Sequence, residues 1–413
     1  MDNNRRVVIT GIGAIAPNGI GKDEFWDALK NGNSGIKKIT YFDSSIFPFH
    51  LAGEINDFDP KAFMSIKAIH RTDRSTHLAV AATRMALEDA RLQLTDKLQE
   101  EIHTIIGTAM SGHVSYIEQL RVYFTKGYKN LSPFAAVSCF PDACSGQLAI
   151  IFGLRGPAET ICAGCAASTN STIDAYKRIK LGETDVCIAG GTDAPLSESI
   201  MCAFSQARVL SQKENNTPAP FDKNRDGTVL SEGAGMLIME ELGYALKRSV
   251  PIYAEIVGSA TTTDAYNMAS TEPIGKEKVR AIKIALKSAG IAPNEVEYIN
   301  AHGTGTQMND ANETVVIKEV FGEYAYKIPI SSTKSMIGHT QGACGVLEII
   351  ATILALKKGI IHPTINYQTP DPECDLNYVP NKAISKKVNI ALSNSFAFGG
   401  KNSIIVLKKY IDA

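Results

Sequence analysis

Two kinds of hydrophobic pattern alternate along the chain, and each predicts a different element. Short apolar runs rich in β-branched residues predict strands, whereas apolar residues recurring with the helical period predict helices. The expected strands are Val7–Thr10, Thr104–Gly107, Thr160–Cys162, Val186–Gly190, Gly233–Glu241, Tyr253–Gly258, Val296–Ala301 and Ile404–Lys408. The expected helices are Arg74–Ala90, Ala166–Leu181, Lys276–Ala289, Asn312–Phe321 and Ala343–Lys357. Strands that alternate with helices indicate an α/β protein with buried, largely parallel sheets.

The order of these elements suggests two similar halves. A break is expected near Val250–Pro251, where a strand and a short charged helix end and Tyr253–Gly258 begins a new strand. The chain opens in the same way at Arg6–Thr10. We therefore expect an N-terminal half at 1–251 and a C-terminal half at 252–413, because 413 residues exceed one ordinary core.

Composition narrows the class of protein. Hydrophobic residues make up 44% and charged residues 21%, which is typical of a globular protein, and the net charge is −1. Global charge therefore predicts neither nucleic acid nor membrane as a partner. The apolar run after Arg6 is too short for a signal peptide, and no apolar stretch has membrane-spanning length, so a cytoplasmic location is expected. Eight cysteines are too few for a disulfide scaffold, so reduced thiols are expected.

Two common motifs are present but lack the context they need. Val7–Ala16 runs from a strand into G-x-G-x-x-A, yet Pro17 follows where a phosphate-binding helix should begin, so a dinucleotide site is not expected. Cys162 and Cys165 form a C-x-x-C without a second pair or a nearby pair of histidines, so no metal site is expected. A redox role for the two cysteines remains an alternative, and it predicts a disulfide in the oxidised protein.

Cys165 is the candidate nucleophile. It lies where a strand passes through Gly164 into a helix, so its thiol should face the positive end of that helix. This position predicts a lowered pKa and nearby backbone N–H groups that could hold an oxyanion. A buried structural cysteine is the alternative.

Two histidines and one glycine-rich turn complete the candidate chemistry. His302 and His339 both border glycines at expected strand-to-helix junctions, where α/β proteins place functional groups. The turn Asn394–Gly400 carries two aromatic residues, Phe396 and Phe398, beside flexible glycines. It suits a gate over an apolar pocket, with core packing as the alternative.

Taken together, these segments resemble the β-ketoacyl-acyl-carrier-protein synthases of the type I/II class, which include the type II polyketide ketosynthases. The matching stretches are RRVVITGIGAIAPNG, GLRGPAETICAGCAAS, DVCIAGGTDAP, FDKNRDGTVLSEGAG, YINAHGTGTQMND, SSTKSMIGHTQGACGVLE, PTINYQTPDPECDLNYVPN and NSFAFGG. The resemblance implies a thiolase-type fold, with two similar halves in five layers, α/β/α/β/α. It also implies an obligate dimer and a decarboxylative condensation of an acyl-enzyme with malonyl-acyl-carrier protein.

The resemblance also assigns roles to residues. Cys165 matches the acyl-accepting nucleophile and His302 and His339 match the pair that drives decarboxylation. Lys334 and Glu348 match a supporting ion pair, and Phe398 matches the gate whose N–H joins that of Cys165 in the oxyanion hole. The matching substrate-binding residues are Thr304, Thr306, Met110, Phe204 and Phe396. No metal or redox cofactor is implied, since substrates are carried on the phosphopantetheine of acyl-carrier protein.

Basic residues at Lys67, Arg71 and Arg208 match positions that dock the acidic carrier protein, and Arg74 lies near the first two in sequence. A solvated charged face is the alternative. The dimer could contain two copies of this chain, or this chain and a chain-length-factor-like subunit that lacks the cysteine. An intact Cys165 argues that this subunit is the active one. Ordinary fatty-acid elongation and a specialised polyketide pathway both remain open.

Three departures from the family pattern concern the gate and the acyl pocket. Ala397 and Lys401 stand where GFGGTN has glycine and threonine. Pro141 and Asp142 fall in Ser138–Gln147, a normally apolar interface helix, and Ala135 occupies a position that is often aromatic. We expect a disturbed helix there and a wider or more polar pocket.

Overall fold

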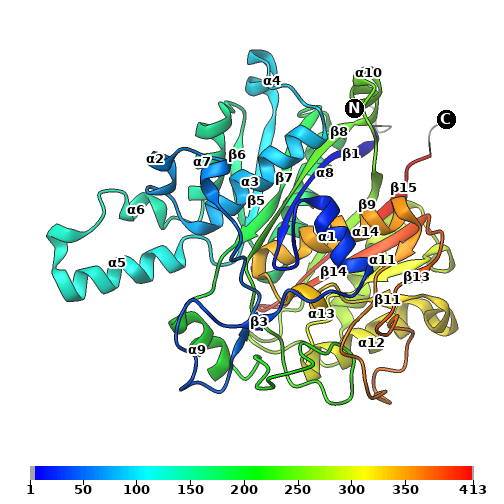
Figure 1. The fold of residues 1–413 in the computed structure, drawn as a ribbon. Helices are drawn as coiled ribbons and strands as arrows, with labels where there is room; N and C mark the ends of the chain where they lie inside the picture. Colours follow the sequence, from blue (N-terminus) through cyan, green and yellow to red (C-terminus); the bar gives the residue numbers. More distant parts are fainter. Residues whose placement is uncertain (1–4, 412–413) are drawn as a thin grey trace.

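Each half of the chain builds a five-stranded section of sheet with the same strand order (Figure 1). The computed structural model describes residues 5–411. The N-terminal section runs β6 (Ala158–Cys162), β5 (His103–Thr108), β7 (Val186–Asp193), β8 (Gly233–Glu241) and β1 (Val7–Ala16). The C-terminal section runs β11 (Ile330–Ser331), β10 (Tyr298–Asn300), β14 (Ile390–Ala397), β15 (Lys401–Lys409) and β9 (Ala254–Thr263).

Strand directions also repeat between the two sections. In each section, the first three strands are parallel to one another. The fourth strand pairs antiparallel with both the third and the fifth. The two sections meet where Val7–Ile9 pairs with Ala254–Ile256, which joins them into one sheet. The expectation of two similar halves is therefore confirmed. The boundary between residues 251 and 252 stays a prediction, in the segment that connects α10 (Leu242–Arg248) to β9.

Helices separate and cover the two sections in five layers. The central layer holds α8 (Ala167–Leu181) and α14 (Cys344–Lys358), which pack against each other and against strands of both sections. On the outer faces, α3 (Arg74–Asp89) covers β1 and β8, and α11 (Lys276–Ala289) covers β9 and β15. Since α14 is surrounded by protein, it is apolar on nearly every side and buried from Cys344 to Leu356.

The remaining elements form the ends and connections. The helices are α1 (Lys22–Lys30), α2 (Ile66–Ile69), α4 (Asp96–Glu101), α9 (Glu198–Gln206), α12 (Gln307–Phe321) and α13 (Lys334–Ile337). The short strands are β2 (Gly19–Ile20), β3 (Lys37–Lys38), β4 (Leu51–Ala52), β12 (Ile360–Ile361) and β13 (Ile384–Ser385). In the described part of the chain, every helix is too short or too polar to cross a membrane.

The glycines of the G-x-G-x-x-A segment serve helix packing. Strand β1 continues through them to Ala16, six residues beyond the predicted end at Thr10. A Cβ on Gly11 would lie 2.3 Å from the Ala86 carbonyl oxygen, and one on Gly13 would lie 1.9 Å from that of Ala82. Both carbonyls belong to α3, so the glycines allow this helix to lie directly on the strand. The segment forms no phosphate-binding turn, as expected.

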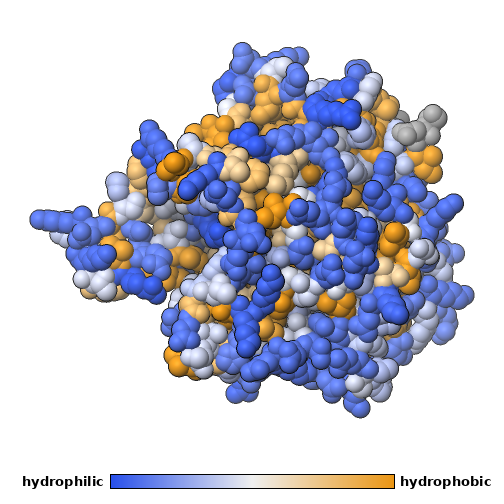
Figure 2. All heavy atoms as spheres, viewed as in Figure 1, coloured by the Kyte–Doolittle hydropathy of each residue, from blue (hydrophilic) through white to orange (hydrophobic). Residues whose placement is uncertain are grey.

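A helical arm projects from the N-terminal half (Figure 1). It comprises α5 (His113–Lys126) and α6 (Ala135–Ser138), and α7 (Ala143–Phe152) returns the chain to the body. The helix breaks at Pro141 and Asp142, between α6 and α7, as expected from these two residues. No residue of α5 is buried. Figure 2 shows apolar and polar side chains mixed over the arm, whose exposed apolar residues are Tyr116, Leu120, Tyr123, Phe124, Tyr128, Val137 and Phe140.

Candidate active site

Cys165 lies in a short turn between the edge strand β6 and the central helix α8. The turn, Gly164–Ala166, is a 3₁₀ helix that continues directly into α8. Gly164 has φ +57°, and a Cβ there would lie 3.4 Å from the Cβ of Ala397 in the glycine-rich turn. The thiol is buried at 8% exposure. Its Sγ lies 3.8 Å from Oε1 of Gln341, which accepts a weak hydrogen bond from it.

His302 follows β10, and three hydrogen bonds fix its backbone and its ring. Its backbone N–H donates to Oε1 of Glu313 at 3.0 Å. The Lys334 ammonium donates to the carbonyl oxygen of His302 at 2.8 Å and to its ring Nδ1 at 3.2 Å. The same ammonium forms an ion pair with the carboxylate of Glu348, and both side chains are completely buried. Nδ1 of His302 is therefore an acceptor, which places the ring proton on Nε2.

His339 reaches the same cavity from a different kind of junction than predicted. It follows the short helix α13 rather than a strand, and its backbone is fixed by bonds to Val229 at 2.7 Å and Ser231 at 3.0 Å. Its Nδ1 accepts the backbone N–H of Gln341 at 3.2 Å. This bond also leaves the ring proton on Nε2. The His302 and His339 rings lie 5.7 Å apart and nearly perpendicular.

Burial keeps both imidazoles neutral. Burial, reinforced by the positive charge of Lys334, lowers the pKa of His302 and of His339 well below the usual histidine value. Two neutral rings thus present Nε2–H donors near one thiol. Such fixed donors stabilise negative charge that develops on a substrate oxygen, without first having to reorganise.

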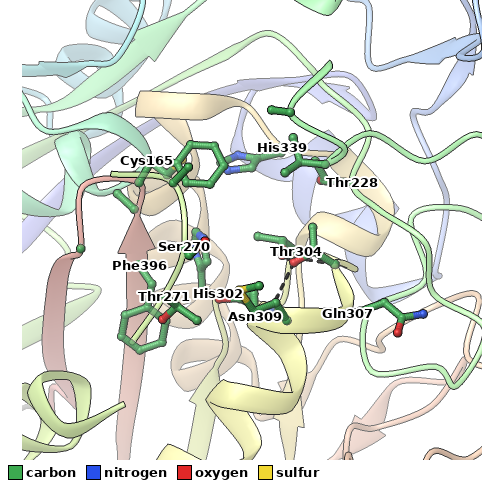
Figure 3. Close-up of a pocket in the computed structure, with 18 of the residues that line it drawn as sticks. Cys165, Thr228, Ser270, Thr271, His302, Thr304, Gln307, Asn309, His339 and Phe396 are labelled. Carbon is green, nitrogen blue, oxygen red and sulfur yellow. Dashed lines mark hydrogen bonds between the residues drawn. The ribbon is translucent and has the colours of Figure 1, made fainter. Parts of the chain in front are cut away.

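One cavity of about 450 Å³ connects these groups. Figure 3 shows Cys165, His302 and His339 around it, with Thr304 farther along. The hydroxyl oxygens of Thr304 and Thr306 lie 2.9 Å apart on its wall. The three predicted aromatic residues, Phe204, Phe396 and Phe398, also line it. Phe398 is 45% exposed, as a side chain at the cavity mouth would be.

The predicted lowering of the Cys165 pKa is wrong for the free protein. Burial raises this pKa to about 11, although the positive charge of Lys334 acts in the opposite direction. The helix begins where the sequence predicted, but the thiol is buried, and a buried thiolate is poorly solvated. Activation of the sulfur therefore requires the incoming substrate or a proton acceptor.

The other predicted binding residues divide into two groups. Lys67, Arg71 and Arg208 are exposed; the Arg71 guanidinium lies 4.3 Å from the ring centre of Phe134, and Arg208 lines the cavity. Arg74 corrects the sequence prediction, because its guanidinium is bonded within the protein. It donates to both oxygens of Glu232 at 2.6 and 2.7 Å and to the carbonyl of Ile55 at 2.8 Å. Arg74 thus has a structural role.

Met110 does not line the cavity of the single chain. It is partly buried in an apolar cluster that also contains Phe204, Val114 and Ile117. A role in substrate binding stays a prediction at this position.

Sequence reasoning missed several cavity residues. Gln341 is 3% exposed and lines the cavity beside Cys165, but no periodicity reveals which way one residue of a loop points. Lys278 is a buried ammonium on the wall, bonded to Asn312 at 2.8 Å and lying 4.5 Å from the centre of the Phe396 ring. Burial lowers the pKa of Lys278 to about 8.

Asp193 carried a signal that could have been used, since it closely follows the predicted strand Val186–Gly190, at the end where functional groups gather. Its buried carboxylate accepts the N–H groups of Ala109, Met110 and Ser111 and the N–H of Gly342 at 2.6 Å. It thereby ties the loop after β5 to the loop that carries His339.

Among the described residues, one group of potential metal ligands lies at the site, namely His302, Cys344 and Glu348, whose ligand atoms are within 4.8 Å of one another. The Lys334 ammonium already bonds Nδ1 of His302 and the carboxylate of Glu348. A metal cation there would meet a fixed positive charge, so the donor set does not suit a metal.

Comparisons with known proteins agree with this geometry. Residues 4–245 match the family described as "Beta-ketoacyl synthase, N-terminal domain", and residues 253–368 match "Beta-ketoacyl synthase, C-terminal domain". The chain is 42% identical to 3-oxoacyl-[acyl-carrier-protein] synthase 2 of Synechocystis sp. (strain ATCC 27184 / PCC 6803 / Kazusa), with 98% of each chain covered. It is also 42% identical to the protein of that name from Staphylococcus aureus (strain N315), covering 99% of this chain and 100% of the relative.

Solved structures give the same fold. A type II polyketide synthase ketosynthase, in complex with its acyl-carrier protein, superimposes with a TM-score of 0.91 at 36% identity. The ishigamide ketosynthase/chain length factor gives a TM-score of 0.91 at 34% identity. Each comparison covers 98% of this chain and 100% of the other. The thiolase-type fold is therefore confirmed.

Proposed function

The chain belongs to the β-ketoacyl synthase family, and on this basis we propose that Cys165, His302 and His339 carry out its condensation reaction. The enzyme is a 3-oxoacyl-acyl-carrier-protein synthase, an acyltransferase that extends an acyl chain with malonyl-acyl-carrier protein. The reaction needs no metal or redox cofactor, because both substrates arrive as thioesters on the phosphopantetheine of the carrier protein. The cavity lined by Thr304 and Thr306 would receive that arm.

In the first half-reaction, Sγ of Cys165 attacks the carbonyl carbon of the acyl thioester. A tetrahedral intermediate forms, the bond from carbon to the pantetheine sulfur breaks, and the thiol proton passes to the departing sulfur. Backbone N–H groups of Cys165 and Phe398 would hold the oxyanion. The acyl group is then a thioester on the enzyme, from which sulfur can leave again.

In the second half-reaction, the thioester oxygen of the malonyl group would accept the Nε2–H groups of His302 and His339. The bond to the carboxylate breaks, carbon dioxide leaves, and the electron pair forms an enolate whose charge lies on that oxygen. The enolate carbon attacks the acyl carbonyl, and Sγ of Cys165 departs. The observation that carries this assignment is that both Nδ1 atoms accept hydrogen bonds, so both rings are donors at Nε2.

The test is the intact mass of the protein after incubation with acyl-carrier proteins of several chain lengths. We expect one acyl adduct on the wild type and none on Cys165→Ala. An adduct that persists on Cys165→Ala, or a wild type that condenses without one, would contradict the assignment. A Cys162–Cys165 disulfide in place of an acyl adduct would favour the redox alternative.

We also propose that the enzyme works as a dimer in the cytoplasm. Strand β6 is the edge of the N-terminal section and is partly exposed along its length, and the neighbouring arm carries the exposed apolar residues described above. A partner that covers both would remove an open sheet edge from solvent. A homodimer and a pair with a cysteine-lacking chain-length-factor-like subunit are both consistent, and co-purification from the native source separates them.

Docking of the carrier protein is proposed at Lys67, Arg71 and Arg208. All three are exposed, and Arg208 stands at the cavity that the pantetheine arm would enter. Positive side chains there complement an acidic partner and speed its encounter. Fatty-acid and type II polyketide elongation use the same geometry, so the pathway depends on which acyl chains the pocket accepts.

A further inference from the structure

We propose that Gln341 recognises an oxygen on carbon 3 of the acyl chain held on Cys165, so that the preferred primers are β-oxo or β-hydroxy acyl chains. The inference rests on the proposed function, because it requires the chain to be attached at Sγ of Cys165. It names a substrate class within that function, since a fully reduced fatty acyl chain has no oxygen at this position.

The side chain of Gln341 is fixed beside the sulfur. Its Oε1 lies 3.8 Å from Sγ, and its backbone N–H is bound to Nδ1 of His339. The backbone of Gln341 adopts φ +50°, a value that residues other than glycine rarely take. The backbone N–H of the neighbouring Gly342 donates to the carboxylate of Asp193 at 2.6 Å. Backbone strain of this kind persists where the surroundings hold it in place. The backbone of Gln341 is therefore held in place, and its side-chain amide reaches the cavity beside Cys165.

The amide nitrogen is left without a partner. Gln341 is 3% exposed, and among the described residues nothing accepts a hydrogen bond from its buried Nε2. Buried polar groups are nearly always bonded, so an unpartnered donor on a cavity wall indicates an acceptor supplied by a ligand. Thr228 and Asn402 also line the cavity with an unpartnered oxygen. The Asn402 oxygen is an acceptor, whereas the Gln341 amide carries an unpartnered donor and has its Oε1 3.8 Å from Sγ of Cys165.

The chemistry of the chain decides which acceptor fits. The oxygen on carbon 1 is the thioester oxygen, which the oxyanion donors would hold. Each decarboxylative condensation places the next oxygen on carbon 3, and none on carbon 2. Because the Gln341 amide lies beside Sγ, the first acceptor it can meet along the chain is the oxygen on carbon 3. A chain that lacks this oxygen leaves the amide unpaired. A site with an unpaired buried polar group binds such a substrate analogue poorly.

The experiment compares two primers of equal length on carrier protein, butanoyl and 3-hydroxybutanoyl, by timed intact mass of the Cys165 adduct. The wild type should load the hydroxylated chain at least about tenfold faster, the ratio that one hydrogen bond of about 1.4 kcal/mol supplies. Gln341→Met keeps the length of the side chain and removes the donor, so it should reduce that ratio about tenfold, chiefly by slowing the hydroxylated chain. The saturated primer serves as the matched control within each variant.

Two results would overturn the inference. One is a wild type that loads both primers at the same rate, which needs no variant to observe. The other is a Gln341→Met enzyme that slows both primers equally, since this would indicate only a general role in positioning His339. Failure of the proposed function would look different, because the wild type would then form no adduct with either primer.

Discussion

Replacing Lys334 with methionine would test the role of the buried ammonium most directly. In the wild type this group donates to Nδ1 and to the carbonyl oxygen of His302 and pairs with Glu348. Without it, Nδ1 of His302 loses its donor and the ring is no longer confined to the Nε2–H form. Loss of one donor to a developing oxyanion typically costs about 10²–10³ in rate. We therefore expect Lys334→Met to slow decarboxylation of malonyl-acyl-carrier protein by that factor.

The same change should destabilise the protein in a pH-dependent way. Glu348 is completely buried, and its Oε2 has no partner among the described residues even with Lys334 present. Removing one member of a buried ion pair costs about 3–5 kcal/mol. In the wild type, burial outweighs the charge of Lys334 and raises the pKa of Glu348 to about 7. Without Lys334 that pKa rises further.

The sign of the pH effect follows from where the proton binds. The folded state of Lys334→Met binds a proton on Glu348 more tightly than the unfolded state does. Its free energy of unfolding should therefore be closest to that of the wild type in mild acid, and should fall as pH rises through the raised pKa. Denaturant unfolding at several pH values measures this, and a deficit that is constant with pH would refute the electrostatic explanation.

A double variant separates stability from catalysis. Lys334→Met with Glu348→Gln removes both charges, so most of the free energy of unfolding should return. The His302 ring still lacks its donor, so decarboxylation should remain slow. A double variant that regains the wild-type rate would show that Lys334 acts on stability alone, and the proposed control of the His302 tautomer would then be wrong.

Three further changes test other parts of the site. Because burial raises the pKa of Cys165 to about 11, its alkylation by iodoacetamide should speed up about tenfold per pH unit between pH 7 and 9; a plateau near neutral pH, read by intact mass, would contradict this. Gly164→Ala should reduce acyl loading at least tenfold, because it forces a side chain into φ +57° beside Cys165, with circular dichroism as the check on folding. Lys67→Glu should raise KM for the carrier protein more at low salt than at high salt, whereas Arg74→Ala should lower the melting temperature without changing the salt dependence of KM.

The sequence predicted the elements well where their pattern was regular and less well where packing set their limits. The strand Gly233–Glu241 has the predicted bounds, since polar residues border its apolar run on both sides. Strand β1 is longer than predicted because the prediction ended it at Thr10, before Gly11 and Gly13, whereas these glycines continue the strand and make room for α3. The sequence pattern alone does not reveal that a neighbouring helix approaches so closely.

Site prediction divided along similar lines. Cys165, His302 and His339 lie at turns whose glycines could be recognised, and the fold brings them together. The pKa of Cys165 was predicted in the wrong direction, because burial depends on what the rest of the chain places around the thiol. Gln341 was missed because the direction of one side chain in a turn is set by tertiary contacts, here the approach of its amide oxygen to Cys165 from the other half of the chain.

The central layer has a consequence for how the enzyme can be divided. The turn with Cys165 opens α8, which belongs to the first half, while His339 and the loop that opens α14 belong to the second. A fragment spanning only one half would possess either the attacking sulfur or the proton-bearing rings, never the complete set. Catalysis therefore requires the two halves to be packed against each other. Substitutions that weaken the packing between α8 and α14 should abolish activity even when every reacting side chain is intact.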